Sequence, residues 1–292
     1  MHIKYGIDLI NLCDEKNSHI YDIAIQFEND KTGQEKEEIL KVMSNRYKIM
    51  VESAKLALNR SDLKCKIIGG EAKKVRDRYT KEKPVCGLTM AKAISYALST
   101  MEANASMNKI VASPTAGSCG VMPAVFLSLQ ESHGIEDKDI VNGLLTASMV
   151  GMIIAKNATL SGAKGGCQAE VGSASAMAAA GVVEIIGGSP VQALTAASIA
   201  IKNVMGLICD PIAGLVESPC SKRNAMGTSN ALISAEMALA GIESVIPFDE
   251  VVDAMYRVGN MLPCSLKETS LGGIAITPTG KKIKKEIFGD DK

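Results

Sequence analysis

The sequence predicts an all-α protein, mostly helical, in which glycine-rich loops between helices hold the chemistry. Apolar residues recur every three or four positions in several long segments, which is the period of an amphipathic helix, and no segment alternates apolar and polar residues as a half-buried strand does. Glycine and methionine are abundant among the 292 residues, which is typical of closely packed helices. Hydrophobic residues make up 47% of the chain and charged residues 22%, so we expect one folded, globular domain over residues 1–292.

The composition disfavours several classes of protein. Lysine plus arginine and aspartate plus glutamate each number 32, so no net charge draws the chain to nucleic acid or to a membrane. Aromatic residues are only 3%, which disfavours stacking platforms for single-stranded nucleic acid. We see no secretory signal, and eight cysteines without one indicate reduced thiols or metal ligands. The expected compartment is the cytoplasm.

Residues 1–84 are predicted to hold lead-in helices and a surface segment. Thr32 and Glu35 have the spacing of a capping box, which predicts that a helix starts there and continues to about Leu58. Residues 64–84 combine two adjacent glycines with a run of charged side chains. We interpret this segment as a solvated surface, a hinge or a contact with another chain.

Residues 85–292 are predicted to form the core that carries the chemistry. The helix that begins at Ser189 has a strong start signal, because serine, Pro190 and Gln192 occupy the N-cap, N1 and N3 positions. The window Ile140–Ala155 is strongly apolar but shorter than the roughly 20 residues that span a membrane, so a buried core helix is predicted. Helices are predicted over residues 88–107, 139–157, 172–186, 189–204, 229–240 and 247–261.

A loop with the sequence SPTAGSCG, Ser113–Gly120, precedes an apolar helix. The first backbone N–H groups of a helix lack internal partners, and the helix dipole favours negative charge there. The loop is therefore a candidate anion site. An ordinary tight turn is an equally good interpretation of the same residues.

Three cysteines stand beside glycines and prolines. Cys167 lies in SGAKGGCQAEVG, whereas Cys209 and Cys220 end the segment CDPIAGLVESPC. No C-x-x-C pair is present, which disfavours a zinc ribbon, a thioredoxin-like centre and a ferredoxin. Spacing alone favours buried structural thiols. The neighbouring glycines and prolines instead suit loops that approach a metal cluster closely, and both interpretations stay open at this point.

The remaining cysteines are not predicted to be ligands. Cys119 lies in the candidate anion loop and is interpreted as a residue near the site. The others have ordinary helical or surface surroundings and are Cys13, Cys65, Cys86 and Cys264.

Four motifs resemble those of the iron–sulfur-dependent L-serine dehydratase family, in particular the α chain of its two-subunit bacterial form. They are SPTAGSCG, SGAKGGCQAEVG, CDPIAGLVESPCSKRNAMG and ETSLGGIAITPTG, and the resemblance covers nearly the whole chain. It implies a helical catalytic domain whose [4Fe–4S] cluster is held by Cys167, Cys209 and Cys220. The iron without a protein ligand would act as a Lewis acid on the substrate hydroxyl. A base would remove the Cα proton, and pyruvate and ammonia would form without pyridoxal phosphate.

The resemblance also implies which residues surround the substrate L-serine. The expected substrate-binding residues are Ser113, Thr115, Ala116, Gly117, Ser118, Arg223 and Asn224, of which the last two contact either substrate or cluster sulfurs. Glu170 and Lys222 are candidates for the polar residues that surround the site. For Lys222 and Arg223, a surface ion pair is an equally good interpretation. The base is not identified, because the three histidines, His2, His19 and His133, lie outside the motifs.

Two departures from the family pattern point to a partner chain. Single-chain members carry an N-terminal regulatory and substrate-binding region with a Ser-His-Thr segment, which this sequence lacks. A β chain is expected to supply that region in a heterodimer, and it can also contribute the catalytic base. Some single-chain members end in a cysteine that caps the open iron, whereas this sequence ends in GDDK, so that inhibition is expected to be absent.

Two other functions are compatible with the sequence. A related L-cysteine desulfidase would use a similar cluster domain to release sulfide. A helical scaffold subunit with buried thiols would have no catalytic role and no colour.

Overall fold

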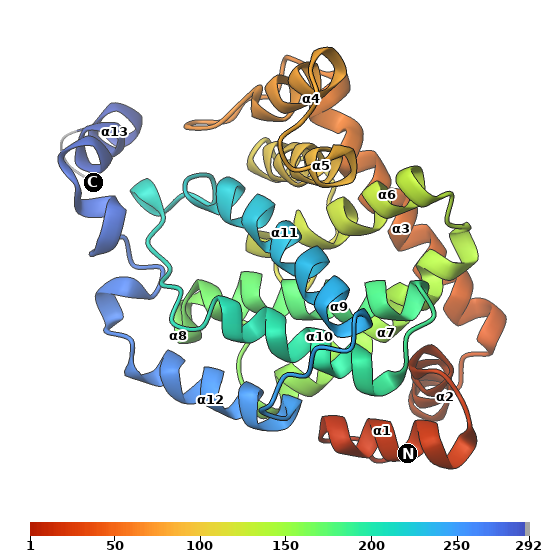
Figure 1. Cartoon of the computed structure of the whole chain (residues 1–292). Helices are drawn as coiled ribbons and strands as arrows, with labels where there is room; N and C mark the ends of the chain where they lie inside the picture. Colours follow the sequence, from red (N-terminus) through yellow and green to blue (C-terminus); the bar gives the residue numbers. More distant parts are fainter. Residues whose placement is uncertain (290–292) are drawn as a thin grey trace.

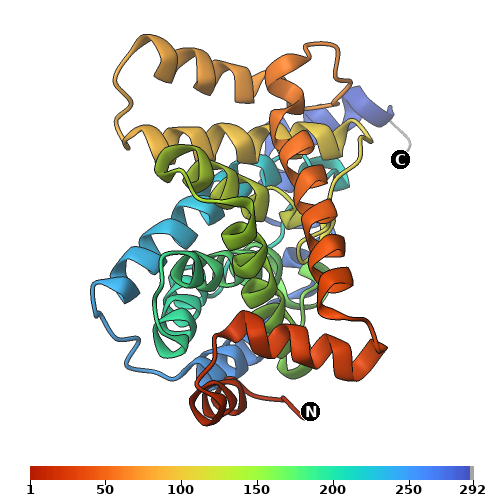
Figure 2. The ribbon, with the colours of Figure 1, turned by 90° about the vertical axis from the view of Figure 1, so that its right-hand side faces the viewer.

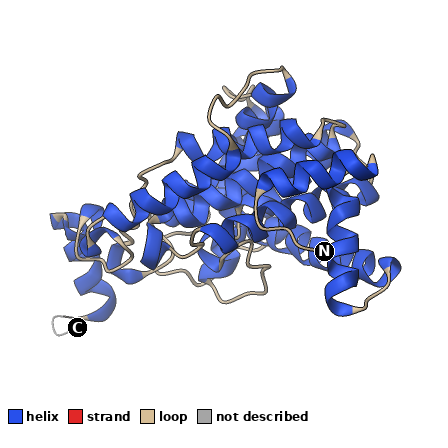
Figure 3. Ribbon diagram, turned by 90° about the horizontal axis from the view of Figure 1, so that it is seen from below, coloured by secondary structure: helices blue, strands red, loops and turns tan. Residues whose placement is uncertain are grey.

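The computed structural model describes residues 1–289 and is built from helices and loops (Figure 3). No strand occurs in this range. The β-type pairing found within it is an isolated bridge between Cys209 and Lys267. The all-α prediction is therefore confirmed. The last three residues of the GDDK end lie outside the described residues.

The order of elements follows most of the predicted helices. The α-helices are α1 (Gly6–Lys16), α2 (Ile20–Thr32), α3 (Lys36–Asn59), α4 (Glu71–Lys81), α5 (Leu88–Ala105), α6 (Val121–His133), α7 (Asp137–Asn157), α8 (Gly162–Gly165), α9 (Ser173–Ile185), α10 (Pro190–Asn203), α11 (Cys220–Leu239), α12 (Phe248–Met261) and α13 (Pro278–Phe288). Short 3₁₀ or π turns include η1 (Ala116–Ser118), η2 (Gln168–Gly172), η3 (Ile212–Gly214) and η5 (Gly273–Ile276). Ser189 caps α10 as predicted, accepting the Gln192 N–H at 3.2 Å.

Helix α9 is the centre of the fold and packs against α7, α10 and α11 (Figure 1). Its residues from Ser173 to Glu184 are all buried. Small side chains let the neighbouring helices approach closely, as at Gly181, where an added Cβ would lie 2.6 Å from the carbonyl oxygen of Gly143 on α7. The core is therefore built on close helix contacts between alanine, serine and glycine residues.

This contact gives a stability prediction. We expect Gly181→Ala to lower the free energy of unfolding by about 1–3 kcal/mol, because the new methyl group meets backbone and the Phe126 ring. Urea denaturation of the apo-protein measures the change. Ser148→Ala, at an exposed position of α7, is the control, and a Gly181→Ala protein as stable as this control would contradict the close packing.

Helix α7 contains the apolar window that was predicted to be a core helix. By length and composition α7 is able to cross a membrane, but 67% of its most apolar window is buried inside the protein. It packs mainly against α9 and α2. The prediction of a buried core helix is confirmed.

The first long helix starts later than the sequence predicts. Thr32 ends α2, where its hydroxyl donates to the Glu28 carbonyl at 2.8 Å, and Gly33 follows with φ 73°. A threonine bonded to the preceding turn and followed by a left-handed glycine ends a helix, so α3 begins at Lys36 and the capping-box prediction was wrong.

The charged run after the adjacent glycines forms helix α4, where we had predicted only a surface segment. It lies on α5 at one end of the molecule (Figure 2). Ala72 is the buried residue of α4, which explains why no apolar period revealed the helix.

Helix α11 begins at Cys220 instead of near Ser229. The segment SKRNAMG is therefore helical. This shift places Arg223 and Asn224 one turn after Cys220, where residues three and four apart share a helix face.

Candidate functional site

The three predicted ligand cysteines come from three separate elements. Cys167 directly precedes η2, Cys209 follows α10, and Cys220 is the first residue of α11. Cys167 and Cys209 are each 4% exposed and pack together with Val171 and Leu207. Cys220 is close enough for its charge to act on Cys209 and for the charge of Cys167 to act on it. The fold therefore gathers the three thiols into one group, in which Cys220 is only partly buried.

Burial makes these thiols hard to ionise. It raises the pKa of Cys167 to about 11, against the attraction of the Arg223 guanidinium. It raises the pKa of Cys220 to about 12 and that of Cys209 still higher, and the charges of Cys167 and Glu170 add to both shifts. A positively charged partner is needed to hold all three as thiolates at neutral pH, as a metal centre does.

The donor set fits an iron–sulfur cluster, because such clusters are held by cysteine thiolates. A cluster binds its thiolates through different irons, so the sulfur atoms need not meet at one point. Gly162 leaves room beside these sulfurs, because an added Cβ would lie 3.2 Å from Cys209 Sγ and 2.7 Å from Glu170 Oε2.

The close approach at Gly162 gives a second prediction. Gly162→Ala is expected to reduce iron retained per chain about tenfold, because either Cys209 or Glu170 must shift. Iron analysis after anaerobic purification and desalting measures this loss. Ala163→Ser, at an exposed position of α8, is the control, and wild-type iron content in Gly162→Ala would show that the sulfurs have room to spare.

The Ser113–Gly120 loop lies against the cysteines because Asn224 joins them. The Asn224 side chain accepts from the Gly120 N–H at 2.9 Å and donates to the carbonyl oxygens of Gly117 at 2.8 Å and Cys220 at 2.9 Å. Asn224 is fully buried. Its amide therefore holds the loop against the start of α11, while a contact with substrate stays a prediction.

Glu170 brings a carboxylate from η2 to the same loop. Thr115 Oγ1 donates to Glu170 Oε1 at 2.9 Å, and the carboxylate lies beside Gly117. Burial raises the pKa of Glu170, the Thr115 hydrogen bond opposes the shift, and the charge of Glu268 adds to it. Ser118 is fully buried and Ser113 nearly so, whereas Ala116 between them is exposed, so the loop is anchored in the interior while its middle reaches the surface.

Arg223, whose side chain is 16% exposed, forms an ion pair with the buried Asp210 beside the cysteine group. Its Nη2 donates to Asp210 Oδ1 at 2.8 Å, and its Nη1 donates to the Ile208 carbonyl at 2.8 Å. Asp210 Oδ2 accepts the Ile274 N–H at 2.8 Å, which ties the C-terminal motif to the cysteines. The surface ion pair considered from the sequence is wrong for Arg223, because Asp210 is only 1% exposed.

Lys222 does form an exposed ion pair, with Glu71 on α4.

The histidines lie on other elements: His2 precedes α1, His19 caps α2, and His133 ends α6. Cys119 is buried with its Sγ 3.8 Å from Met101 Sδ. Cys13 is buried in α1, Cys65 contacts the Glu102 carbonyl, and Cys86 and Cys264 are exposed.

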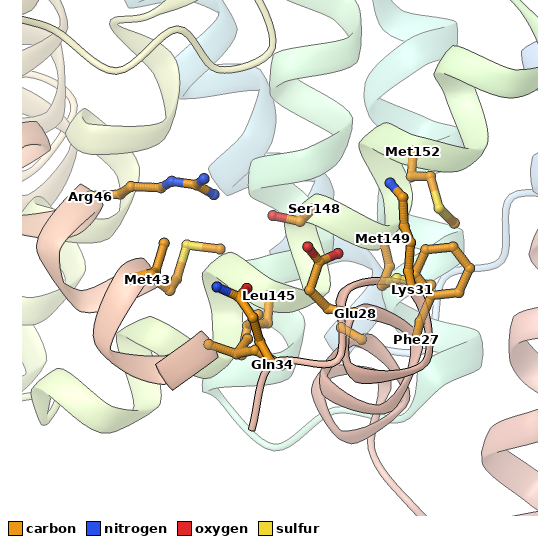
Figure 4. Close-up of a pocket in the computed structure, with 13 residues that line it drawn as sticks. Phe27, Glu28, Lys31, Gln34, Met43, Arg46, Leu145, Ser148, Met149 and Met152 are labelled. Carbon is orange, nitrogen blue, oxygen red and sulfur yellow. The ribbon is translucent and has the colours of Figure 1, made fainter. Parts of the chain in front are cut away.

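A cavity of about 270 Å³ lies elsewhere, between α2, α3 and α7 (Figure 4). Methionines, including Met43 and Met149, line it together with polar side chains such as Glu28 and Arg46. No cysteine and no predicted site residue lines this cavity. It is separate from the candidate site.

Sequence reasoning missed two acidic residues next to the cysteines, Asp210 and Glu217. Both are almost fully buried, at 1% and 4% exposure, and both are held by several donors. The signal in the sequence was their position between Cys209 and Cys220. A carboxylate that lies between two cysteines of the same site is expected to be shielded from solvent.

Comparison with known proteins identifies the family of the chain. Residues 15–275 match the family model described as serine dehydratase alpha chain. The chain is 50% identical over 282 residues to the L-serine dehydratase alpha chain of Peptoniphilus asaccharolyticus, covering 96% of this chain and 97% of that one. It is 46% identical to a probable L-serine dehydratase alpha chain of Bacillus subtilis, covering 97% and 94%.

A longer relative matches over part of its length. The L-serine dehydratase of Mycobacterium tuberculosis is 38% identical over 282 residues, which cover 92% of this chain and 60% of that one. The family match and the near-complete coverage of the shorter relatives agree with the motif resemblance. The chain belongs to the serine dehydratase α-chain family.

Proposed function

We propose that this chain is the α subunit of an L-serine ammonia-lyase, which dehydrates and deaminates L-serine to pyruvate and ammonia. Relatives that carry the name L-serine dehydratase alpha chain support the reaction, at 46% and 50% identity over almost the whole chain. The observation that carries the proposal is the grouping of the buried Cys167 and Cys209 with the partly buried Cys220 beside the Ser113–Gly120 loop.

The proposed cofactor is a [4Fe–4S] cluster held by the three cysteines. When bound, it would supply a Lewis acid that makes the substrate hydroxyl a better leaving group. Arg223 places a positive charge near Cys167, which favours the thiolate form of this ligand. The ion pair with Asp210 fixes the position of that guanidinium, so its positive charge stays near Cys167.

The Ser113–Gly120 loop is the proposed site for the substrate carboxylate. The N–H groups of Ala116 and Gly117 open η1 and have no hydrogen-bond partner among residues 1–289, so they can donate to an anion. Glu170 lies on the adjacent side and offers a negative charge for the substrate ammonium. The carboxylate of a bound amino acid would thus face backbone N–H donors, and its ammonium group would face the Glu170 carboxylate.

The base that removes the Cα proton is proposed to come from a β chain. The names of the shorter relatives describe them as alpha chains, which supports a partner. None of the three histidines lies among the residues of the candidate site described above. A cytoplasmic location remains the proposal made from composition.

A coupled assay of the α and β chains tests the function. We expect pyruvate from L-serine with the anaerobic complex, and less product from L-threonine or L-cysteine. The Cys220→Ser complex is the control and should release no pyruvate. An iron-loaded complex that releases sulfide from L-cysteine but no pyruvate from L-serine would contradict the proposal.

A further inference from the structure

A buried glutamate in the loop between Cys209 and Cys220 is held by backbone from a distant part of the chain. Glu217 is 4% exposed and lies shortly before Cys220. Its carboxylate accepts the N–H groups of Lys66 at 3.0 Å, Ile67 at 2.7 Å and Ile68 at 3.1 Å. Consecutive N–H groups that point at one carboxylate form an anion-binding concavity.

This contact fixes the glutamate firmly. Hydrogen bonds to an ionised carboxylate are stronger than those between neutral groups, and a buried carboxylate that loses its donors pays a large desolvation cost. The main chain of Glu217 is also tied to the first turn of α11, because its carbonyl oxygen accepts the Ser221 N–H at 2.9 Å. Cys220, next to Ser221, is therefore connected to residues 66–68 through one side chain.

A second glutamate provides a natural comparison. Glu102 on α5 is 2% exposed and accepts the N–H groups of Gly70 at 2.9 Å, Glu71 at 2.8 Å and Ala72 at 3.0 Å. It holds the start of α4 in the same way. No hydrogen bond joins Glu102 to residues 209–220 within the described part of the chain.

We propose that Glu217 is a positioning residue for the cysteine site: the backbone of residues 66–68 holds its carboxylate and thereby keeps Cys220 in ligating position. The inference rests on the proposed function, because it takes Cys220 as a cluster ligand. It assigns a positioning role to residues 66–68, which the sequence analysis interpreted as part of a solvated surface, a hinge or a contact with another chain. The ion pair between Lys222 and Glu71 joins α11 to the start of α4 at the surface.

Matched neutral variants test the proposal in the full-length chain. Glu217→Gln and Glu102→Gln each remove one buried charge from a set of backbone donors. We expect iron to leave the anaerobic Glu217→Gln protein about tenfold faster than wild type when a ferrous chelator is added, since supporting contacts of ligands typically change metal affinity tenfold or more. Glu102→Gln should release iron within about twofold of wild type, and Glu217→Asp, which keeps the charge, should recover part of the loss.

The thermal unfolding of both apo-variants separates positioning from general stability. Equal iron release from the two glutamine variants, or release from Glu217→Gln at the wild-type rate, would overturn the proposal. If Glu102→Gln has the same melting temperature as Glu217→Gln and releases iron equally fast, the faster release reflects general stability, and the proposal is also overturned.

Hydrogen exchange of the wild-type protein tests the same link without a variant. Coupling between two sites is reciprocal, so loading the cluster should slow exchange of the amides of residues 66–68 more than those of residues 70–72. No difference between the two groups of amides on loading would refute the coupling. If wild-type protein binds no iron at all, the proposed function fails first, whereas normal loading with no effect of Glu217 removes only this inference.

Discussion

Serine in place of any one of Cys167, Cys209 or Cys220 is expected to abolish stable iron binding. Each variant leaves two thiolates for the cluster, and two ligands in a buried site do not hold four irons against a chelator. We expect at least about a tenfold loss of iron and sulfide per chain, measured after anaerobic purification. The visible absorption near 400 nm, typical of iron–sulfur proteins, should disappear with the metal.

The control for these three variants is Cys65→Ser. Cys65 is half-buried, donates to the Glu102 carbonyl and is not one of the predicted ligands. It should keep wild-type iron content. Full iron in Cys167→Ser, Cys209→Ser or Cys220→Ser would remove that residue from the ligand set.

Arg223→Ala is expected to destabilise the apo-protein by about 3–5 kcal/mol, which is the effect of removing one partner from a buried ion pair. Asp210, which is 1% exposed beside Arg223, would be left with one remaining donor, the Ile274 N–H. The Ile208 carbonyl would also lose its partner. Denaturant unfolding without iron measures the change separately from any effect on the cluster.

The neighbouring residue is a matched control for this second variant. Lys222 forms an exposed ion pair with Glu71, and its side chain is 55% exposed. Surface ion pairs contribute about 0–1 kcal/mol, so Lys222→Ala should change stability little. An Arg223→Ala protein as stable as Lys222→Ala would contradict a buried, structural role for the guanidinium.

The sequence predicted the helical class and the core helices because apolar periodicity reports packing directly. Ile140–Ala155 and the cap at Ser189 are examples in which pattern and structure agree. Helix α4 was missed because Ala72 is its buried residue, and α11 was predicted to start too late because no side chain caps it before Cys220.

The candidate site was less accessible from the sequence. Motifs identified the cysteines and the Ser113–Gly120 loop, but the pairing of Asp210 with Arg223 depends on a helix start that the sequence did not reveal. Glu217 was missed because glutamate is usually exposed, and its donors come from a segment far away in the chain. Tertiary contacts of this kind leave no local pattern.

The most direct test of the account is the iron and acid-labile sulfide content of wild-type protein purified without oxygen. The account predicts roughly four irons and four sulfides per chain, with a brown colour that air bleaches. Protein that stays colourless and free of iron, even after anaerobic reconstitution with iron and sulfide, would contradict the central claim that Cys167, Cys209 and Cys220 hold a cluster.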